Sequence, residues 1–346
     1  SHFNCLPSCN FKEKNMGQTI LLNNRPEGTP NLGNFKFEEQ SVGDPQEGEL
    51  LVKSKYVSVD PYLRGRMNDT KSYVPPFEVG KPLTSGIIAE VIESKHPDYK
   101  AGDYVSKVMP WKTLQVITTE DLHKVDASKA PLSAYLGILG MTGLTAYTGL
   151  TEIGKPKENE TLLVSGAAGA VGSIVGQIGK LLGLRVVGIA GSDEKINMLK
   201  QNFNFDAGIN YKTTDDLTAA IIEHCPEGVD IYFDNVGGEI SDAVLYHINK
   251  YARIINCGAI AVYNETTIPK SLSVQPFLIK NSALMQGFIV SNYASKFEEA
   301  IAQLAEWLKQ EKLVYTETIV EGFENIPQAF LDLFDGKNKG KMIIKI

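Results

Sequence analysis

The sequence predicts a two-domain α/β protein, in which a doubly wound parallel sheet follows an antiparallel, barrel-like domain. From Ile20 to Leu139, short runs of alternating apolar and polar residues are separated by Gly, Pro and Asp, which is typical of antiparallel strands. From Thr161 onward, apolar runs alternate with stretches of helical spacing, which predicts βα units. With 346 residues, the chain is long enough for two separate cores.

The parallel domain is expected to contain six strands joined by helices. We place the strands at residues 161–165, 185–190, 207–210, 229–234, 253–256 and 283–290, and the helices between them at 173–182, 196–203, 215–225 and 239–249. A glycine-containing helical stretch, 132–150, precedes them, and an amphipathic helix follows Ala294. The final strand, KMIIKI, is expected to return to the first domain.

These patterns give the domain boundaries. The parallel domain is assigned to residues 141–293, and the first domain to residues 17–140 and 294–346. Residues 1–16 are expected to be a disordered extension, because Met16 is a plausible native start.

Composition and charge exclude several classes of function. The net charge of −7 offers no basic face for nucleic acid or for an anionic membrane surface, and no apolar run approaches the length of a membrane span. The four cysteines are scattered, which indicates a reducing compartment, and we expect a cytoplasmic protein. The five histidines are isolated and no C-x-x-C pair occurs, so no metal site is expected.

The turn after the first parallel strand predicts a dinucleotide cradle. Gly166, Gly169 and Gly172 lie between a strand and a helix, where the backbone can approach a pyrophosphate and the helix N-terminus offers free N–H groups. This domain is therefore interpreted as a Rossmann domain. The G-x-x-G-x-x-G spacing is looser than G-x-G-x-x-G, and the alternative is a crossover in which the glycines only allow close packing.

The end of the second parallel strand favours NADPH over NADH. NAD sites usually place an acidic residue there to hold the ribose 2′-OH, but this strand ends in Gly191 and Ser192. Ser192 suits a helix N-cap, followed by two carboxylates in the first turn. Lys195 and Tyr211 are then candidates to bind a 2′-phosphate. The alternative for Lys195 is an ordinary solvated helix lysine.

Three further loops are candidates for the active cleft. The loops at 234–238 and 257–260 follow parallel strands, whose carboxyl ends bind ligands in such sheets, and Tyr263 comes directly after the second loop. In the first domain, DPYLRGRM (60–67) carries Tyr62 and two arginines, and its alternative is a polar surface turn. Cys257 is interpreted as a small buried residue, with a reactive thiol as the alternative.

A nicotinamide reductase needs a donor for the negative charge that develops on the oxygen of the substrate. Neither a zinc ligand set nor a nucleophile-elbow motif is visible in the sequence. A tyrosine hydroxyl is therefore the expected helper.

Several strings in this order resemble one family: DPYLRGR, GMTGLTAY, VSGAAGAVGSIVGQIGK, GSDEK, YFDNVGGE, INCGAI, EGFENIPQAF and GKNKGK. They are similar to the zinc-free medium-chain reductases, especially the prostaglandin reductase and leukotriene dehydrogenase group with its plant alkenal reductases and bacterial curcumin reductases. The likeness covers residues 17–346. It implies a GroES-like domain plus a Rossmann domain, a homodimer, and NADPH-dependent reduction of the C=C bond of α,β-unsaturated ketones or aldehydes.

The resemblance also implies roles for individual residues. It assigns catalysis to Tyr263 and substrate contact to Tyr62. The residues that it implies for the cofactor are Gly169, Ala170, Val171 and Gly172 at the pyrophosphate, Lys195 and Tyr211 at the 2′-phosphate, Asn235 at the ribose, Cys257, Gly258, Ala259, Ile260, Phe288, Ile289 and Val290 at the nicotinamide, and Asn338 in the tail.

The expected reaction sends hydride to the β-carbon, with Tyr263 and a ribose hydroxyl stabilising the enolate and solvent protonating the α-carbon through Tyr62. Two alternatives stay open, an NADPH quinone reductase and an NADPH-binding protein without turnover. The chain has Thr142 where the family often has proline, and residues 68–82 and 265–276 fit no single subgroup. The sequence therefore leaves the identity of the enone or enal open.

Overall fold

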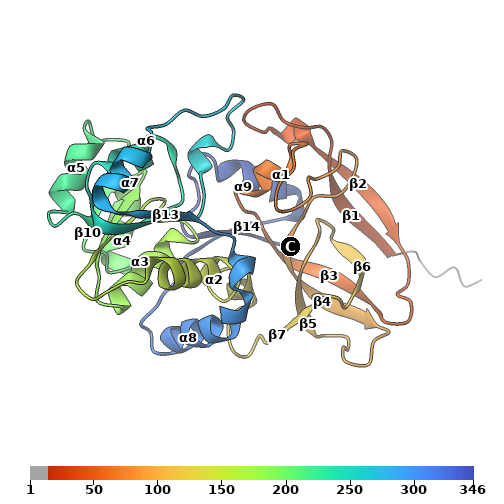
Figure 1. The fold of residues 1–346 in the computed structure, drawn as a ribbon. Helices are drawn as coiled ribbons and strands as arrows, with labels where there is room; N and C mark the ends of the chain where they lie inside the picture. The colour runs from red at the N-terminus through yellow and green to blue at the C-terminus, as the bar shows by residue number, and fades with distance from the viewer. Residues whose placement is uncertain (1–14) are drawn as a thin grey trace, which may run out of the picture.

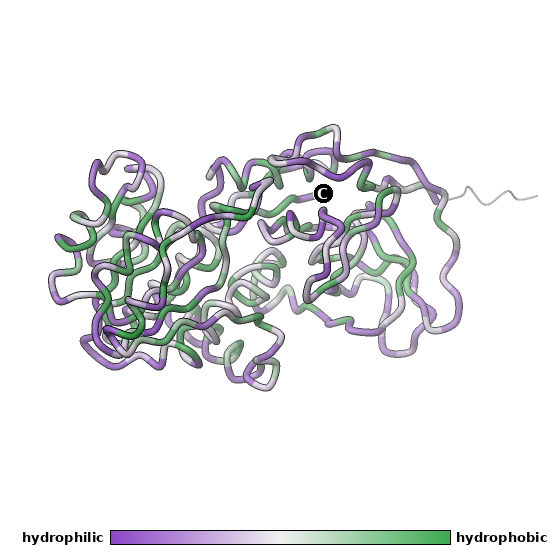
Figure 2. Tube along the Cα trace, turned by 45° about the horizontal axis from the view of Figure 1, so that its top comes forward, coloured by the Kyte–Doolittle hydropathy of each residue, from purple (hydrophilic) through white to green (hydrophobic). Residues whose placement is uncertain are grey.

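A computed structural model describes residues 15–346, which form two units side by side (Figure 1). The expected extension lies outside the described residues, except for Asn15 and Met16. These two residues begin strand β1 (Asn15–Leu22), so the expectation of disorder is wrong for them, because β1 pairs with β2 (Phe35–Val42) along its whole length. Figure 2 shows hydrophobic segments running through the interior of both units.

The first unit is built on a seven-stranded sheet with the order β14-β15-β3-β4-β5-β7, and β6 also pairs with β3. Its pairs are antiparallel except for β14 with β15. In its core, Phe35 stacks on Trp111 and meets Phe330 edge to face. The strands are β3 (Glu49–Ser58), β4 (Thr84–Ser94), β5 (Tyr104–Pro110), β6 (Leu114–Thr118), β7 (His123–Val125), β14 (Glu317–Glu321) and β15 (Lys341–Lys345), and the helices are α1 (Leu63–Arg66) and α9 (Ile326–Asp332).

The second unit is a six-stranded parallel sheet with the order β10-β9-β8-β11-β12-β13. The strand order reverses between β8 and β11, which is where open α/β sheets bind their ligands. The strands are β8 (Thr161–Val164), β9 (Arg185–Ala190), β10 (Ala207–Asn210), β11 (Val229–Asp234), β12 (Ile248–Asn256) and β13 (Leu284–Gly287). The predicted fold class, an antiparallel unit followed by a doubly wound parallel unit, is therefore confirmed.

Both faces of the parallel sheet are covered by helices. Leu162 and Val164 belong to one apolar cluster and Leu163 to another, because successive strand residues point to opposite faces. The first cluster includes side chains of α2 (Met141–Thr148), α3 (Gly172–Leu181), α4 (Asp193–Asn202) and α8 (Phe297–Lys309), and the second those of α5 (Leu217–His224), α6 (Gly238–Leu245) and α7 (Gln275–Asn281). This double burial explains why the strands read as continuous apolar runs.

Two boundaries differ from the expectation. Helix α8 packs on the parallel unit, since Leu304 lies in its core and Trp307 contacts Tyr147, so the chain returns to the first unit only at β14 and not at residue 294. The apolar face of α8 packs against α2, which is distant in the sequence, so the local sequence pattern does not reveal this contact. The helix predicted to reach residue 249 ends at Leu245, because strand β12 already starts at Ile248.

Within residues 15–346, no helix is both long enough and apolar enough to cross a membrane.

Candidate active site

The loop between β8 and α3 is shaped by its glycines. Gly166 has a φ of +57°, and a Cβ atom on Gly172 would lie 2.2 Å from the Gly166 carbonyl oxygen, so no larger residue fits at position 172. Helix α3 begins with Val171 as N-cap and has no side-chain cap. The amides of Ser173 and Ile174 donate to backbone carbonyls, whereas those of Ala170, Val171 and Gly172 have no acceptor within residues 15–346 and remain available to an anion. The predicted cradle of Gly169, Ala170, Val171 and Gly172 lies in this loop and first turn.

A strap from the first unit crosses this loop. The Gly340 amide donates to the Ala168 carbonyl at 2.7 Å, and Gly340 forms a β-bridge with Gly169. The Asn338 side chain donates to the Gly340 carbonyl at 2.9 Å. Asn338, which was expected to lie over the cofactor, is thereby placed beside the glycine loop.

The end of β9 carries a cluster of cations. Ser192 caps α4 by accepting a hydrogen bond from the Lys195 amide at 3.2 Å, as predicted. The Lys195 ammonium donates to the Gly336 carbonyl at 2.6 Å. Burial lowers the pKa of Lys195, and the nearby positive charges of Lys212 and Lys339 lower it further. Glu194, which pairs with Lys339, acts in the opposite direction, but three ammonium groups outnumber this one carboxylate, so the group favours an anionic ligand.

Tyr211 lies at the same place as the lysine cluster. A Cβ atom built on Gly191 would be 3.4 Å from the Tyr211 hydroxyl and 3.2 Å from Lys212. The structure therefore brings the predicted pair, Lys195 and Tyr211, to one end of β9. Sequence reasoning missed Lys212, although it follows Tyr211 directly, and Lys339, which ion-pairs with Glu194 from the far end of the chain.

Asp234 is the centre of a buried hydrogen-bond network at the end of β11, and sequence reasoning did not assign it a role. It is 4% exposed, and its carboxylate accepts hydrogen bonds from two backbone amides and three hydroxyls. The donors are the amides of Val236 and Gly237 and the hydroxyls of Ser165, Tyr232 and Ser241. The Asp234 carbonyl also accepts from the amides of Cys257 and Gly258. This one residue thus fixes the loops that follow β8, β11 and β12.

Asn235, the predicted ribose contact, is fixed by the same network. Its amide donates to the Ser165 hydroxyl at 2.9 Å, and its side chain donates to the Ser165 carbonyl at 2.8 Å. Asn235 therefore lies where β8 and β11 part, at the switch point of the sheet.

The loop after β12 contains Tyr263 and Cys257. The Tyr263 hydroxyl accepts a hydrogen bond from the Ala259 amide at 3.1 Å, which leaves its own proton free to be donated. Burial raises the pKa of Tyr263, so the hydroxyl is neutral at pH 7. Burial, followed by the charge of Asp234, raises the pKa of Cys257 to about 12, which favours the small buried residue over the reactive thiol.

Phe288 packs at the edge of this region. Its ring lies edge-on to Phe233 and Tyr293, with centroid distances of 6.4 and 6.1 Å. A Cβ atom on Gly149 would lie 2.6 Å from the Phe288 ring, so the glycine makes room for it. Ile289 and Val290 follow Phe288 just beyond the end of β13.

Tyr62 and Tyr73 bring the first unit toward this loop. Burial raises the pKa of Tyr62, and the charges of Asp60 and Tyr73 raise it further. Tyr73 also acts on the pKa of Tyr263, and Cys257 acts on that of Tyr73. Since such interactions weaken with distance, Tyr73 lies near enough to both Tyr62 and Tyr263 to affect their pKa values. Sequence reasoning missed Tyr73, which lies in the segment that fits no subgroup.

The arginines beside Tyr62 have structural contacts. Arg64 is 2% exposed and donates to the carbonyl of Gly28, and Arg66 donates to the Pro75 carbonyl and lies 4.0 Å from the centroid of the Phe77 ring. These contacts fold the loop that carries Tyr73 against α1. Of the predicted loop at 60–67, the arginine pair thus has structural contacts, and Tyr62 packs against the core of the first unit.

The fold and the site together define a two-domain, dinucleotide-dependent oxidoreductase. A family model described as the N-terminal domain of oxidoreductase matches residues 18–125, and one described as zinc-binding dehydrogenase matches residues 170–306. A Bacillus subtilis protein named as an NADP-dependent oxidoreductase, YfmJ, is 59% identical over 95% of this chain and 97% of its own.

Other relatives carry more specific names. The NADPH-dependent curcumin reductase of Escherichia coli is 42% identical over 97% of this chain and 98% of its own, and the 2-alkenal reductase (NADP+-dependent) of Nicotiana tabacum is 40% identical over 96% and 98%. The crystal structure of CurA from Vibrio vulnificus in complex with NADPH matches with a TM-score of 0.91 and 40% identity, covering 95% of this chain and 98% of that one.

The chain belongs to the zinc-free medium-chain dehydrogenase/reductase family, as its motifs predicted. In residues 15–346, no three His, Cys, Asp or Glu side chains are grouped so that they could hold a metal ion.

Proposed function

We propose that the protein uses NADPH to reduce the C=C bond of α,β-unsaturated ketones and aldehydes. The observation that carries this proposal is the Tyr263 hydroxyl in the loop after β12, which accepts a hydrogen bond from the Ala259 amide at 3.1 Å and so keeps its own proton for an oxygen of the substrate. The names of the relatives support the same class, because one is a 2-alkenal reductase and another acts on curcumin.

The residues present fit NADP(H). The glycine loop and the uncapped start of α3 suit the pyrophosphate, since a side chain at Gly172 would meet the Gly166 carbonyl at 2.2 Å. Lys195 and Tyr211 suit the 2′-phosphate, and Lys212 and Lys339 add positive charge there. Asn235 suits the ribose. The residues proposed for the nicotinamide side are Cys257, Gly258, Ala259, Ile260, Phe288, Ile289 and Val290, and Asn338 is proposed to close the strap over the cofactor.

Bound NADPH would supply the hydride that the β-carbon of the substrate receives. The electron pair of the C=C bond moves toward the carbonyl oxygen, and Tyr263 donates its hydroxyl proton in a hydrogen bond to this enolate oxygen. Tyrosine suits this position because burial keeps it protonated. A proton from solvent, relayed by Tyr62, then reaches the α-carbon and completes the saturated product.

The partner of the chain is proposed to be a second copy. Strand β13 is at the edge of the parallel sheet, and neither β13 nor α7 contains a buried residue. Ile279 and Leu284 are 78% and 46% exposed. An apolar edge of this kind is suited to pairing with another strand. The molar mass measured by light scattering, as the protein elutes from a size-exclusion column, tests this proposal. The mass of a single chain would reject it.

The deciding experiment follows NADPH oxidation with a panel of an alkenal, an alkenone, a 15-keto prostanoid and a quinone, with NADH in parallel. Turnover of the enal and enones with NADPH, giving saturated carbonyl products, is the expected result. Turnover of the quinone alone would make the protein a quinone reductase. Stoichiometric NADPH binding without any turnover would support a binding protein.

A further inference from the structure

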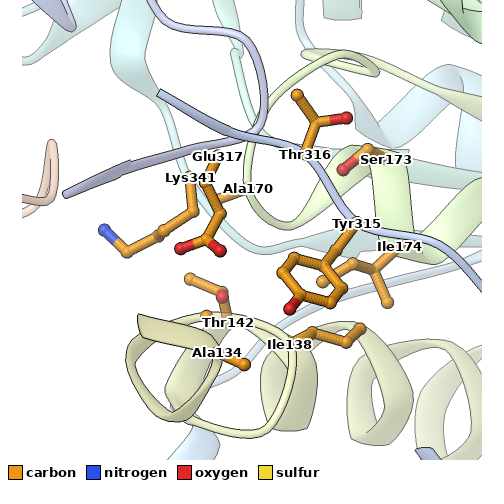
Figure 3. A pocket seen from close by; sticks show the side chains of 11 residues that line it. Ala134, Ile138, Thr142, Ala170, Ser173, Ile174, Tyr315, Thr316, Glu317 and Lys341 are labelled. Atoms are coloured by element: carbon orange, nitrogen blue, oxygen red, sulfur yellow. The ribbon is translucent and has the colours of Figure 1, made fainter. Parts of the chain in front are cut away.

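A small cavity lies where the chain crosses between its two units (Figure 3). One wall is the crossover into the parallel unit, with Ile138 and Thr142, and another is the crossover back, with Tyr315 and Glu317. The start of α3 closes it behind the glycine loop through Ala170 and Ser173. The cavity is therefore bounded by both segments that join the units.

Two polar atoms on this cavity lack partners. Thr142 is 7% exposed, and neither its Oγ1 nor Oε2 of Glu317 has a hydrogen-bond partner in the described protein. They are two of five such buried side-chain atoms found in residues 15–346. Figure 3 shows the Glu317 carboxyl pointing toward Thr142. An unpaired buried polar atom costs about 1–3 kcal/mol, so two on one cavity require an explanation.

Several other polar groups around the cavity are already paired. Ser133 donates to Oε1 of Glu317 at 3.0 Å, and Ser173 donates to the Gly169 carbonyl at 2.7 Å. The Lys341 ammonium donates to the Val59 carbonyl and to Asp60 at 2.9 and 3.1 Å. The Tyr315 and Thr316 hydroxyls also line the cavity, and neither forms a hydrogen bond with Thr142 Oγ1 or Glu317 Oε2, so these two atoms are available to a molecule from outside the protein.

The size and charge of the cavity select the ligand. Its volume is about 10 Å³, which is the room that one water molecule occupies. Lys341 disfavours a cation, and the Glu317 carboxyl disfavours an anion. Burial raises the pKa of Glu317, while Ser133 and Lys341 act against this rise. A water molecule can bond to either form of the carboxyl, because it both donates and accepts.

We propose that this cavity binds one water molecule, which bridges Thr142 Oγ1 and Glu317 Oε2. The bridge joins the two crossovers and thereby helps to hold the angle between the units. This inference does not depend on the substrate or on the proposed reaction.

The test uses crystal structures and thermal unfolding of the full chain and of Thr142→Val, with Thr142→Ser as the matched control that keeps the hydroxyl. The expected result is density for one water, about 2.7–3.2 Å from both atoms, in the wild type and in Thr142→Ser but not in Thr142→Val. The Tm of Thr142→Val should then be lower than that of the wild type by about 2–4 °C, because the water and Glu317 lose a partner.

The Tm is expected to change in the opposite direction if the Thr142 hydroxyl has no partner at all. Thr142→Val would then remove an unpaired buried group, and its Tm would rise. A rise in Tm, or wild-type density that shows other buried waters but none here, overturns the proposal. If Thr142→Val does not fold, the wild-type density decides alone.

Discussion

The two units contribute differently built parts to the proposed site. On the parallel unit, Asp234 is almost fully buried and fixes three loops, so the groups proposed to bind the cofactor are held before it arrives. On the first unit, Tyr73 is 60% exposed and its loop is held mainly through Arg66. The difference indicates that the side proposed to bind the cofactor is preorganised, whereas the side proposed to contact the substrate is more adaptable.

The largest effect is expected on the free energy of unfolding when Asp234, which fixes the loops on the side proposed to bind the cofactor, is replaced. Asp234→Ala leaves its donors without an acceptor, and each unpaired buried group costs about 1–3 kcal/mol, so the free energy of unfolding should fall by at least about 3 kcal/mol. Urea unfolding measures this loss. Asp234→Asn is the control, because its one carbonyl oxygen can keep most of the bonds. Equal stability of Asp234→Ala and the wild type would contradict the preorganised cofactor side.

The next largest effect is expected on kcat when Tyr263, the residue proposed to contact the substrate oxygen, is replaced. Tyr263→Phe should lower kcat by roughly 100-fold, as the loss of one oxyanion donor does elsewhere. Single-turnover kinetics measures the chemical step directly. The exposed Tyr246→Phe is the control. Unchanged chemistry in Tyr263→Phe would remove the proposed role.

The pH dependence sharpens the assignment of Tyr263. Burial raises its pKa above the ordinary value of about 10, and the donating form is the protonated one. Activity due to this group should therefore persist with rising pH and fall only above pH 10. A decline of kcat near pH 8 that disappears in Tyr263→Phe would show that its pKa is not raised.

A smaller effect is expected at the far end of the cofactor side. Lys195→Ala should weaken NADPH binding by about 1.5–3 kcal/mol, the scale of a charge-assisted hydrogen bond, and should leave NADH binding nearly unchanged. Fluorescence titration with both cofactors measures the difference. Lys200→Ala, on the same helix but outside the lysine cluster, is the control. Equal losses for both cofactors would reject the phosphate contact.

The smallest effect is expected on the adaptable side. Tyr73→Phe removes one neutral hydroxyl, which is worth about 0.5–1.5 kcal/mol, so KM for the enone should rise by about 2–10-fold while NADPH binding is kept. Steady-state kinetics with Tyr251→Phe as an exposed control provides the measurement. A change in NADPH binding instead of KM would place Tyr73 on the cofactor side.

The parts of the fold that follow from local pattern were predictable. Strands such as Arg185–Ala190 and Val229–Asp234 are apolar on both faces, and Ser192 begins its helix as a cap, so neither needs distant information. The packing of α8 on α2 depends on a partner far away in sequence, which no periodicity reveals.

The same limit applies to the site. The glycine loop and Lys195 have a local signature, whereas Tyr73 and Lys339 gain their positions from loops that fold back over long distances. Asp234 lies in a loop that the sequence analysis singled out, but its role depends on hydrogen bonds from Ser165 and Ser241. These bonds form only when β8 and α6 are in place. Residues that act through tertiary contacts are thus the ones that sequence reasoning misses.

The strap at Gly340 has a consequence for the order of synthesis. A ribosome releases the glycine loop long before it makes residues 340–345, yet Gly340 covers Ala168 and β15 fills the gap between β14 and β3. Domains generally fold as they emerge, but here the first sheet cannot close until this late segment arrives. A polypeptide cut short before residue 340 would therefore lack both a closed first sheet and a covered glycine loop.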